Sequence, residues 1–166
     1  MLIRIVATNF MSYGQESEFN MLPSSNVRRK SWHVYSPGSG HADVLRTAVI
    51  YGANGAGKSC LVKALGRLQT MVAIGCLPPT AIRDANKYND TKLPVTIEVE
   101  FGTEFDQYAY GVSYRGNLCM EEWLYSTLKK PKYVFERKYD ARTGKTNIKL
   151  AGSPKEEAKN NLLISL

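Results

Sequence analysis

Hydrophobic and polar residues alternate at the start of the chain. In residues 2–7, Leu2, Arg4 and Val6 alternate with Ile3, Ile5 and Ala7. This two-residue period predicts a strand with one face more buried than the other. After a turn at residues 8–14, residues 15–21 carry Phe19 and Met21 on one side and are predicted to form its antiparallel partner.

The same alternation returns in the second half of the chain. Apolar residues at 95, 97, 99 and 101 are separated by Thr96, Glu98 and Glu100, which predicts a half-buried strand. Turn residues Gly116-Asn117 and the stretch 140–146 separate further apolar runs. Further strands are therefore predicted at residues 108–114, 118–128, 132–139 and 147–150, which together form a large antiparallel β-subdomain at about 93–150.

Between these two sets of strands, the apolar residues follow the period of a helix. Leu61, Ala64, Leu65 and Leu68 fall on one stripe, which predicts a helix that runs to about residue 74, where a glycine can end it and two prolines follow. Before it, residues 47–51 form a short, β-branched apolar run that predicts a buried parallel strand.

Three segments lack such a pattern. Residues 23–42 are rich in Ser, Gly, Asn and basic residues and predict a surface insertion, with Trp32, Val34 and Tyr35 as candidate anchors. Residues 80–92 are polar and predicted to be irregular. Residues 153–166 begin with Ser-Pro-Lys-Glu, a capping sequence that predicts the start of a helix.

The chemistry of the chain is concentrated in residues 52–59, which read Gly-Ala-Asn-Gly-Ala-Gly-Lys-Ser. This sequence fits the phosphate-binding P-loop pattern without a mismatch, and a predicted strand and helix flank it as that loop requires. Backbone N–H groups would hold phosphate oxygens, Lys58 would bridge the β and γ phosphates, and the Ser59 hydroxyl would ligate Mg²⁺. The alternative is a glycine-rich turn before an ordinary helix, which has no need of a Lys-Ser pair. The predicted cofactors are ATP and Mg²⁺, with these binding residues: Asn54, Gly55, Ala56, Gly57, Lys58, Ser59 and Cys60.

Composition limits the class of protein. The 166 residues fit one domain, and no apolar run is long enough to span a bilayer or to form a signal peptide, so we expect a cytoplasmic protein without a membrane partner.

Cys60, Cys76 and Cys119 are widely separated and are expected to serve packing, while His33 and His41 lack the neighbours of a metal site. The net charge of +7 is spread along the chain, so a solvated surface explains most of it and nucleic acid is a secondary candidate partner.

A catalytic acid is missing from the sequence. An apolar strand that ends in Asp or Asp-Glu, which would hold Mg²⁺ and polarise the attacking water, occurs nowhere in it. The catalytic residues are therefore unknown, and the segment by itself is expected to be inactive.

Several motifs resemble the N-terminal lobe of ABC-type ATPase heads of the RecF, SMC and OLD-like kind, and more closely the ATPases of bacterial anti-phage systems of the abortive-infection, Septu and PARIS types. The resemblance is carried by Asn9-Phe10 with Ser12-Tyr13, by the P-loop sequence, and by Ile50-Tyr51-Gly52-Ala53-Asn54, Tyr108-x-Tyr110 and Val134-Phe135-Glu136-Arg137. It implies an α/β fold: residues 1–166 would be the N-terminal lobe of a P-loop NTPase head with a large antiparallel β-subdomain. The C-terminal lobe would be absent, and residues 153–166 would begin a helical insertion.

The resemblance also implies functional residues and partners. Two heads would dimerise, or form a higher homo-oligomer, around two ATP molecules, with Asn9 and Phe10 near the base or ribose; the alternative for these two is packing at a strand end. Met11 departs from the family, whose heads often have Arg or Lys there. Gln107 is a weak candidate for the Mg²⁺-sensing glutamine, and Glu121 and Glu122 are interpreted as surface or subdomain contacts.

Two functions are consistent with this resemblance. The first is an ATP-binding head that, once completed by a C-terminal lobe and a dimer partner, hydrolyses ATP and gates an effector protein such as a nuclease in anti-phage defence. The alternative is a non-hydrolysing, nucleotide-bound scaffold, or a RecF/SMC-like ATPase of DNA repair or maintenance. A small-molecule P-loop kinase is disfavoured, because such kinases have a compact parallel sheet without a long antiparallel insert.

Overall fold

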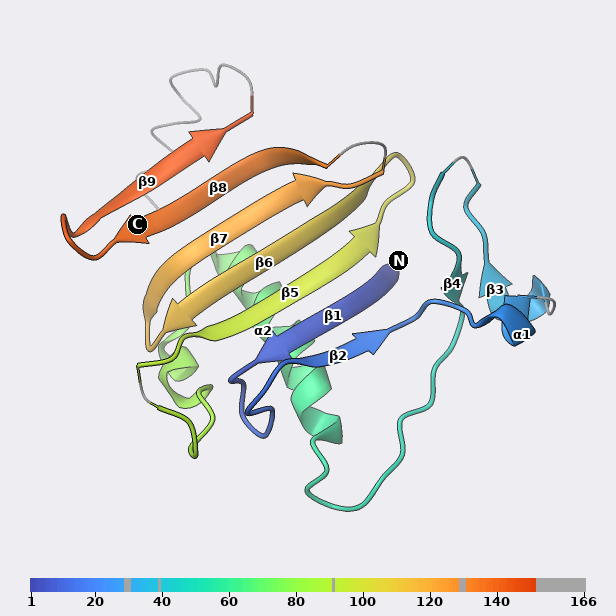
Figure 1. Cartoon of the computed structure of the whole chain (residues 1–166), viewed down its shortest axis with the longest axis horizontal. Coiled ribbons are helices and arrows are strands. Elements are labelled where there is room, and N and C mark those ends of the chain that lie inside the picture. Colours follow the sequence, from blue (N-terminus) through green and yellow to red (C-terminus); the bar gives the residue numbers. More distant parts are fainter. Residues whose placement is uncertain (29–30, 39, 91, 129–130, 152–166) are drawn as a thin grey trace.

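One seven-stranded antiparallel sheet dominates the computed structural model, which describes residues 1–28, 31–38, 40–90, 92–128 and 131–151 (Figure 1). Its strands follow the order β2-β1-β5-β6-β7-β8-β9. The hairpins predicted from the sequence are confirmed. The sequence did not predict that β1 pairs with β5, and this pairing joins the two predicted sets of strands into one sheet. The strands are β1 Leu2–Thr8, β2 Ser17–Asn20, β5 Val95–Gly102, β6 Gln107–Arg115, β7 Leu118–Ser126, β8 Lys132–Asp140 and β9 Lys145–Leu150.

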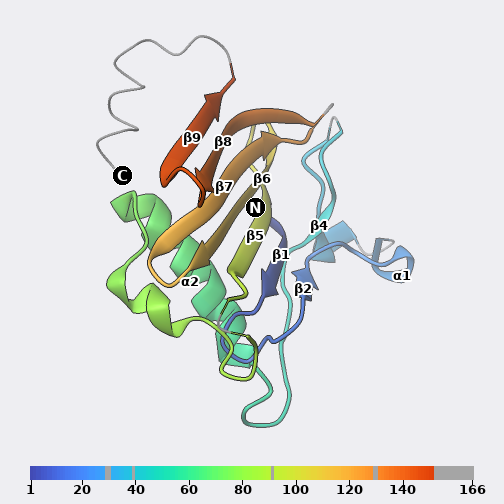
Figure 2. The ribbon, with the colours of Figure 1, turned by 60° about the vertical axis from the view of Figure 1, so that its left-hand side comes forward.

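The one long helix among the described residues, α2 (Lys58–Ile74), packs on the inner face of this sheet (Figure 2). Its predicted bounds are confirmed: Gly75 takes the left-handed conformation at φ 74° and its N–H donates to the carbonyl of Met71. The apolar stripe of α2 meets the alternating inner residues of the strands and closes the core. This core includes Ile5, Ala7, Phe10, Ala64, Leu68, Met71, Ile97, Tyr110, Val112 and Tyr114.

The helix is narrower than the sheet that it covers. Beyond it, an apolar groove of about 850 Å³ runs between the second half of α2 and the inner side chains of Leu124, Phe135 and Ile148. None of the described helices is long and apolar enough to cross a membrane.

Three short elements fall within the predicted surface insertion at residues 23–42, and a short strand follows it. Only Val34 among its three candidate anchors is buried, whereas Trp32 and Tyr35 are largely exposed. The polar stretch 80–92 holds a short helix at its start and is otherwise irregular, as expected, and the helix predicted at 153–166 lies outside the described residues. The elements are α1 Ser25–Arg28, η1 Ser31–His33, β3 Val34–Tyr35, β4 Val44–Leu45 and η2 Pro79–Arg83.

The buried parallel strand predicted at residues 47–51 is wrong. These residues form no strand, and Val49 and Tyr51 are 80% and 90% exposed. A parallel strand is buried by neighbours on both sides, and no strand among the described residues pairs with this segment. Residues 47–51 are apolar, as a buried strand would be, but no strand that could pair with them occurs among the described residues.

A glycine in β6 tests the packing of the outer sheet face. A Cβ atom added at Gly111 would lie 2.2 Å from the indole ring of Trp123, which crosses this position from β7. We expect Gly111→Ala to lower the free energy of unfolding by about 1–3 kcal/mol through overpacking, measured by urea denaturation. Gly66→Ala is the matched control, because a Cβ there meets nothing within 4 Å and should stabilise α2 by up to about 1 kcal/mol. Equal effects of the two substitutions would contradict this packing.

Candidate phosphate-binding site

The predicted P-loop forms a tight turn that leads directly into α2. Gly55 and Gly57 take φ values of 84° and 87°, in the left-handed region that glycine adopts without strain. Gly57 is the residue before the first helical position, and Lys58 begins the helix. The sequence places glycines where the backbone needs them, so the loop closes on the N-terminus of α2.

This geometry leaves several backbone donors free. Within the described residues, no acceptor binds the N–H groups of Gly55, Gly57, Lys58 or Ser59, whereas Cys60 N–H donates to the carbonyl of Gly57 at 2.8 Å. The first N–H groups of a helix carry partial positive charge and point along its axis. A loop with free amides at this end is an anion-binding site for phosphate.

Lys58 adds a full positive charge at the same place. Its Nζ atom donates to the carbonyl oxygens of Gly52 and Ala53, both at 2.7 Å, so the ammonium lies against the loop. These bonds are exposed, and a phosphate would replace neutral acceptors with charged ones, which form stronger hydrogen bonds with a lysine. Lys58 is thus positioned to bind a phosphate at the loop.

The Mg²⁺ ligand predicted from the sequence is the Ser59 hydroxyl. Ser59 is exposed at the first turn of α2, where its hydroxyl is accessible to an ion bound with phosphate. The described part of the chain contains no group of three or more His, Cys, Asp or Glu side chains that could hold a metal ion. The role of Ser59 as a Mg²⁺ ligand stays a prediction.

Two side chains from the turn between β1 and β2 contact the loop. The Tyr13 hydroxyl donates to the carbonyl of Gly57 at 2.8 Å, and the Ser12 hydroxyl donates to Sγ of Cys60 at 3.0 Å. A Cβ atom at Gly57 would lie 2.9 Å from the Tyr13 ring and 3.0 Å from the Ser12 hydroxyl. Gly57 is therefore required both for its conformation and for this close approach. The sequence contained Ser12-Tyr13 beside a strand end but gave no signal of this contact.

A small depression borders the loop on the same side. It has a volume of about 210 Å³ and is lined by Tyr13, Phe19, Ile50, Tyr51 and Lys58 among others. Aromatic and aliphatic side chains next to a phosphate-binding lysine make a surface of the kind on which a nucleoside binds. Tyr51 was not predicted as a site residue, because its apolar run indicated a buried strand.

Asn9 and Phe10, predicted near the base or ribose, are instead buried. Phe10 is fully enclosed in the core, and Asn9 is 2% exposed with its amide donating to the carbonyls of Leu93 and Pro94. Packing at a strand end, the alternative given for these two residues, agrees with this burial. Their contact with nucleotide stays a prediction without support from this arrangement.

A buried ionic network fixes α2 relative to the sheet. Arg67 of α2 binds both carboxylate oxygens of Asp84, at 2.7 and 2.6 Å, and the Tyr114 hydroxyl donates to Asp84 at 2.6 Å. Asp84 is fully buried, and burial followed by the Asp84 hydrogen bond raises the pKa of Tyr114, which keeps its hydroxyl protonated. No sequence pattern indicates this network, because an aspartate in a polar stretch is normally solvated.

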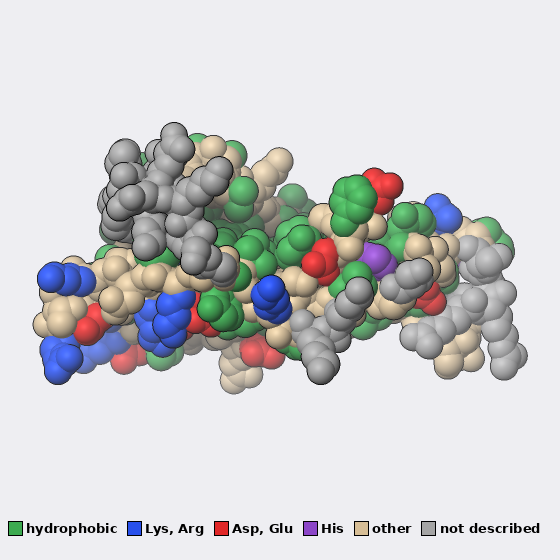
Figure 3. Space-filling view, turned by 90° about the horizontal axis from the view of Figure 1, so that it is seen from above, with side chains coloured by type: hydrophobic (Ala, Val, Ile, Leu, Met, Phe, Trp, Pro, Cys, Tyr) green, Lys and Arg blue, Asp and Glu red, His purple; other side chains and the backbone are tan. Residues whose placement is uncertain are grey.

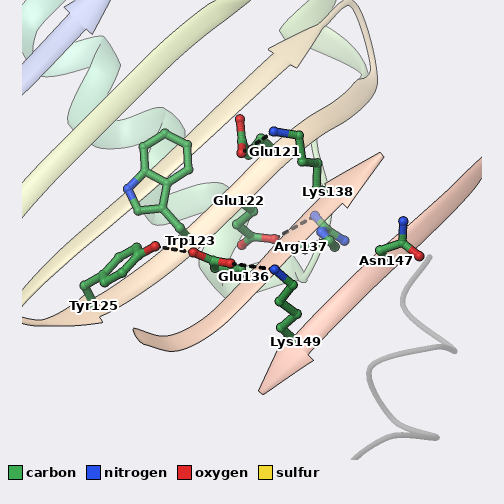
Figure 4. Close-up of a pocket in the computed structure, with 9 residues that line it drawn as sticks. All are labelled: Glu121, Glu122, Trp123, Tyr125, Glu136, Arg137, Lys138, Asn147 and Lys149. Carbon is green, nitrogen blue, oxygen red and sulfur yellow. Dashed lines mark hydrogen bonds and ion pairs between the residues drawn. The ribbon is translucent and has the colours of Figure 1, made fainter. Parts of the chain in front are cut away.

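The remaining candidate residues lie away from the loop. Gln107 pairs with Gly102 at one end of the strands. The phosphate loop contacts the other end, where Thr8 pairs with Thr96, so Gln107 lies far from the loop along the strand direction. Glu122 accepts from Tyr110 and pairs with Arg137 at 2.7 Å, and Glu121 pairs with Lys138 at 3.1 Å (Figure 4). These are the contacts within the subdomain that the sequence predicted for the two glutamates.

Figure 3 shows how charged residues are distributed on one face of the molecule. Blue Lys and Arg side chains collect toward one end of that face, but red Asp and Glu side chains lie between them. Cross-strand pairs such as Lys138 with Glu121 and Lys149 with Glu136 account for part of this mixture. On this face, charges of both signs are therefore mixed.

Comparison with known families agrees with the geometry of the loop. A family model described as "AAA domain, putative AbiEii toxin, Type IV TA system" matches residues 48–154, which is more than half of the chain. The chain belongs to this family of AAA domains. Comparisons with curated proteins and with solved structures find no match.

Membership of the AAA family makes this a P-loop ATPase-like domain that binds nucleotide. Its matched region begins just before the P-loop, at residue 48, and continues through β9. The family domain therefore includes both α2 and the antiparallel sheet from β5 onward. A helix on a mostly antiparallel sheet fits an α/β fold of this class.

The network around Asp84 gives a direct test of what holds α2 in place. Asp84→Ala leaves the Arg67 guanidinium without its buried partner, so we expect a loss of about 3–5 kcal/mol in the free energy of unfolding, measured by urea denaturation. Glu121→Ala is the control, because the Glu121–Lys138 pair is exposed and should contribute less than about 1 kcal/mol. A small loss for Asp84→Ala would show that α2 does not depend on this ion pair.

Proposed function

We propose that this chain is the N-terminal lobe of an ABC-type ATPase head that binds Mg²⁺-ATP at residues 52–60. The observation that carries the proposal is the set of free backbone N–H groups at the start of α2 with the Lys58 ammonium beside them. The binding residues are those of the loop: Asn54, Gly55, Ala56, Gly57, Lys58, Ser59 and Cys60. Tyr51, beside the loop, is the best candidate for the nucleoside side of the site.

The exposed segment before the loop supports a second lobe. Val49 and Tyr51 are strongly exposed, and an apolar run of this kind in solvent marks a surface that another segment covers. A C-terminal lobe that contributes parallel strands beside residues 47–51 would bury them. The same lobe would supply the acid that holds Mg²⁺ and activates water, since no suitable strand end occurs in this chain.

Dimerisation of two such heads around ATP would convert nucleotide binding into a switch. ATP favours a closed state only through contacts that it makes there and not in the open state. We propose that this closure gates a partner effector in bacterial anti-phage defence, with hydrolysis as the step that resets it. A nuclease is the effector class that we favour, and a homodimer is the smallest assembly that suffices.

The first test of the proposal is the lysine. We expect Lys58→Ala to weaken binding of a fluorescent ATP analogue roughly 10- to 100-fold through loss of a charge-assisted contact, with the unfolding transition unchanged. Lys63→Ala is the matched control, since Lys63 is exposed one turn further along the same helix. Unchanged affinity of the Lys58→Ala variant would refute the site.

Hydrolysis by the segment alone is the second test. We expect residues 1–166 to release phosphate from ATP at a rate barely above the uncatalysed background, because binding groups without a catalytic acid position the nucleotide but do not activate water. Phosphate release is followed with the wild-type chain and with the Lys58→Ala variant. Rapid turnover that disappears in the variant would show that an acid within this chain completes the site.

A further inference from the structure

The orientation of one peptide group decides which way the phosphate loop directs its amides. In a trans peptide the C=O and N–H groups point in opposite directions. The carbonyl of Gly57 belongs to the same peptide as the N–H of Lys58, one of the free donors at the start of α2. Whatever holds the Gly57 carbonyl therefore aims the Lys58 amide away from it.

That carbonyl has two donors. It accepts from the N–H of Cys60 at 2.8 Å, within the first turn of the helix, and from the Tyr13 hydroxyl at 2.8 Å, from a separate element. Burial raises the pKa of Tyr13, so the hydroxyl stays protonated as a donor. Of these two donors, Tyr13 is the one that lies outside α2, in the turn between β1 and β2.

Tyr13 is itself fixed by an unusually constrained turn. Asn9 and Met11 take positive φ values of 55° and 50°, a conformation that non-glycine residues adopt rarely and that is strained for a residue as large as methionine. Phe10 and Tyr13 exchange two backbone hydrogen bonds, at 2.9 and 2.8 Å, which close the turn.

The loop after η2 holds this turn from outside. Met11 N–H donates to the carbonyl of Asp84 at 2.6 Å, and the amide of Asn86 donates to the carbonyl of Met11 at 2.7 Å. The amide of Asn89 donates to the carbonyl of Gly14 at 2.6 Å and to the side chain of Asn9 at 2.8 Å. Because Asp84 also binds Arg67, the hydrogen bonds form a closed path from α2 through the turn and back to the start of α2.

We propose that Tyr13 is a positioning residue of the phosphate loop: its hydroxyl, held by the turn at residues 9–14, sets the Gly57 peptide so that the Lys58 amide is directed at phosphate before nucleotide arrives. The strain at Asn9 and Met11 is then part of the site, since it persists only where surrounding contacts enforce it. A loop set in advance loses less conformational freedom on binding, which favours affinity. This proposal deepens the function proposed above and rests on it.

The test is Tyr13→Phe, which removes the hydroxyl and keeps the ring beside Gly57. We expect affinity for Mg²⁺-ATP and for Mg²⁺-tripolyphosphate to fall by the same factor, roughly fivefold, as for loss of one hydrogen bond, with the unfolding transition unchanged. Amide hydrogen exchange at Cys60, whose N–H donates to the same Gly57 carbonyl, should rise in the nucleotide-free variant. Tyr88→Phe is the matched control, because Tyr88 is 97% exposed and should change neither property.

A second variant separates positioning from direct contact. Asn89 holds the turn through its hydrogen bonds to Gly14 and Asn9. Asn89→Ala should therefore weaken tripolyphosphate binding only through Tyr13. The double variant Tyr13→Phe/Asn89→Ala should then bind no more weakly than whichever single variant binds less tightly. Unchanged exchange and affinity in Tyr13→Phe overturn the positioning role alone. A loss for ATP without a loss for tripolyphosphate also overturns it, because the hydroxyl would then act on the nucleoside. A wild-type chain that binds neither probe overturns the proposed function as well.

Discussion

The ion pair between Arg67 and Asp84 is the contact on which the geometry of the candidate site depends. Asp84 is fully buried, Arg67 lies within ion-pair distance of both of its carboxylate oxygens, and Tyr114 donates to one of them from the sheet. A buried charge is tolerated only when it is paired and hydrogen-bonded, so this contact has one well-defined arrangement. It fixes the position of α2 on the sheet, and the start of α2 is where the phosphate would bind.

Asp84 is connected to the phosphate loop by two routes, one through α2 and one through the turn at residues 9–14. Toward the N-terminus of α2, the helix carries Lys58 and the free amides. Through the carbonyl of Asp84 and the amide of Asn86, the same network holds the turn that contains Tyr13. The phosphate loop is therefore held between a helix and a turn that both bind Asp84.

The antiparallel sheet has a more peripheral part in the chemistry. Its far strands, β7 to β9, carry polar pairs on one face and apolar side chains on the other. These strands lie away from the loop and bring no acid to it. The sheet supports α2, and the apolar residues Val49 and Tyr51 before the loop are exposed.

The sequence by itself determined the features that are local along the chain: the P-loop, the bounds of α2 with its glycine end, and the strands with a two-residue period. Each depends on neighbours within a few residues, such as the left-handed conformation of Gly57 and Gly75 or the alternation in β5. Only the tertiary structure decided the rest. Burial of Asn9, Phe10 and Asp84, the contact of Tyr13 with Gly57, and the exposure of residues 47–51 all depend on segments distant in sequence, and a pattern of apolar residues does not specify which distant partner is present or absent.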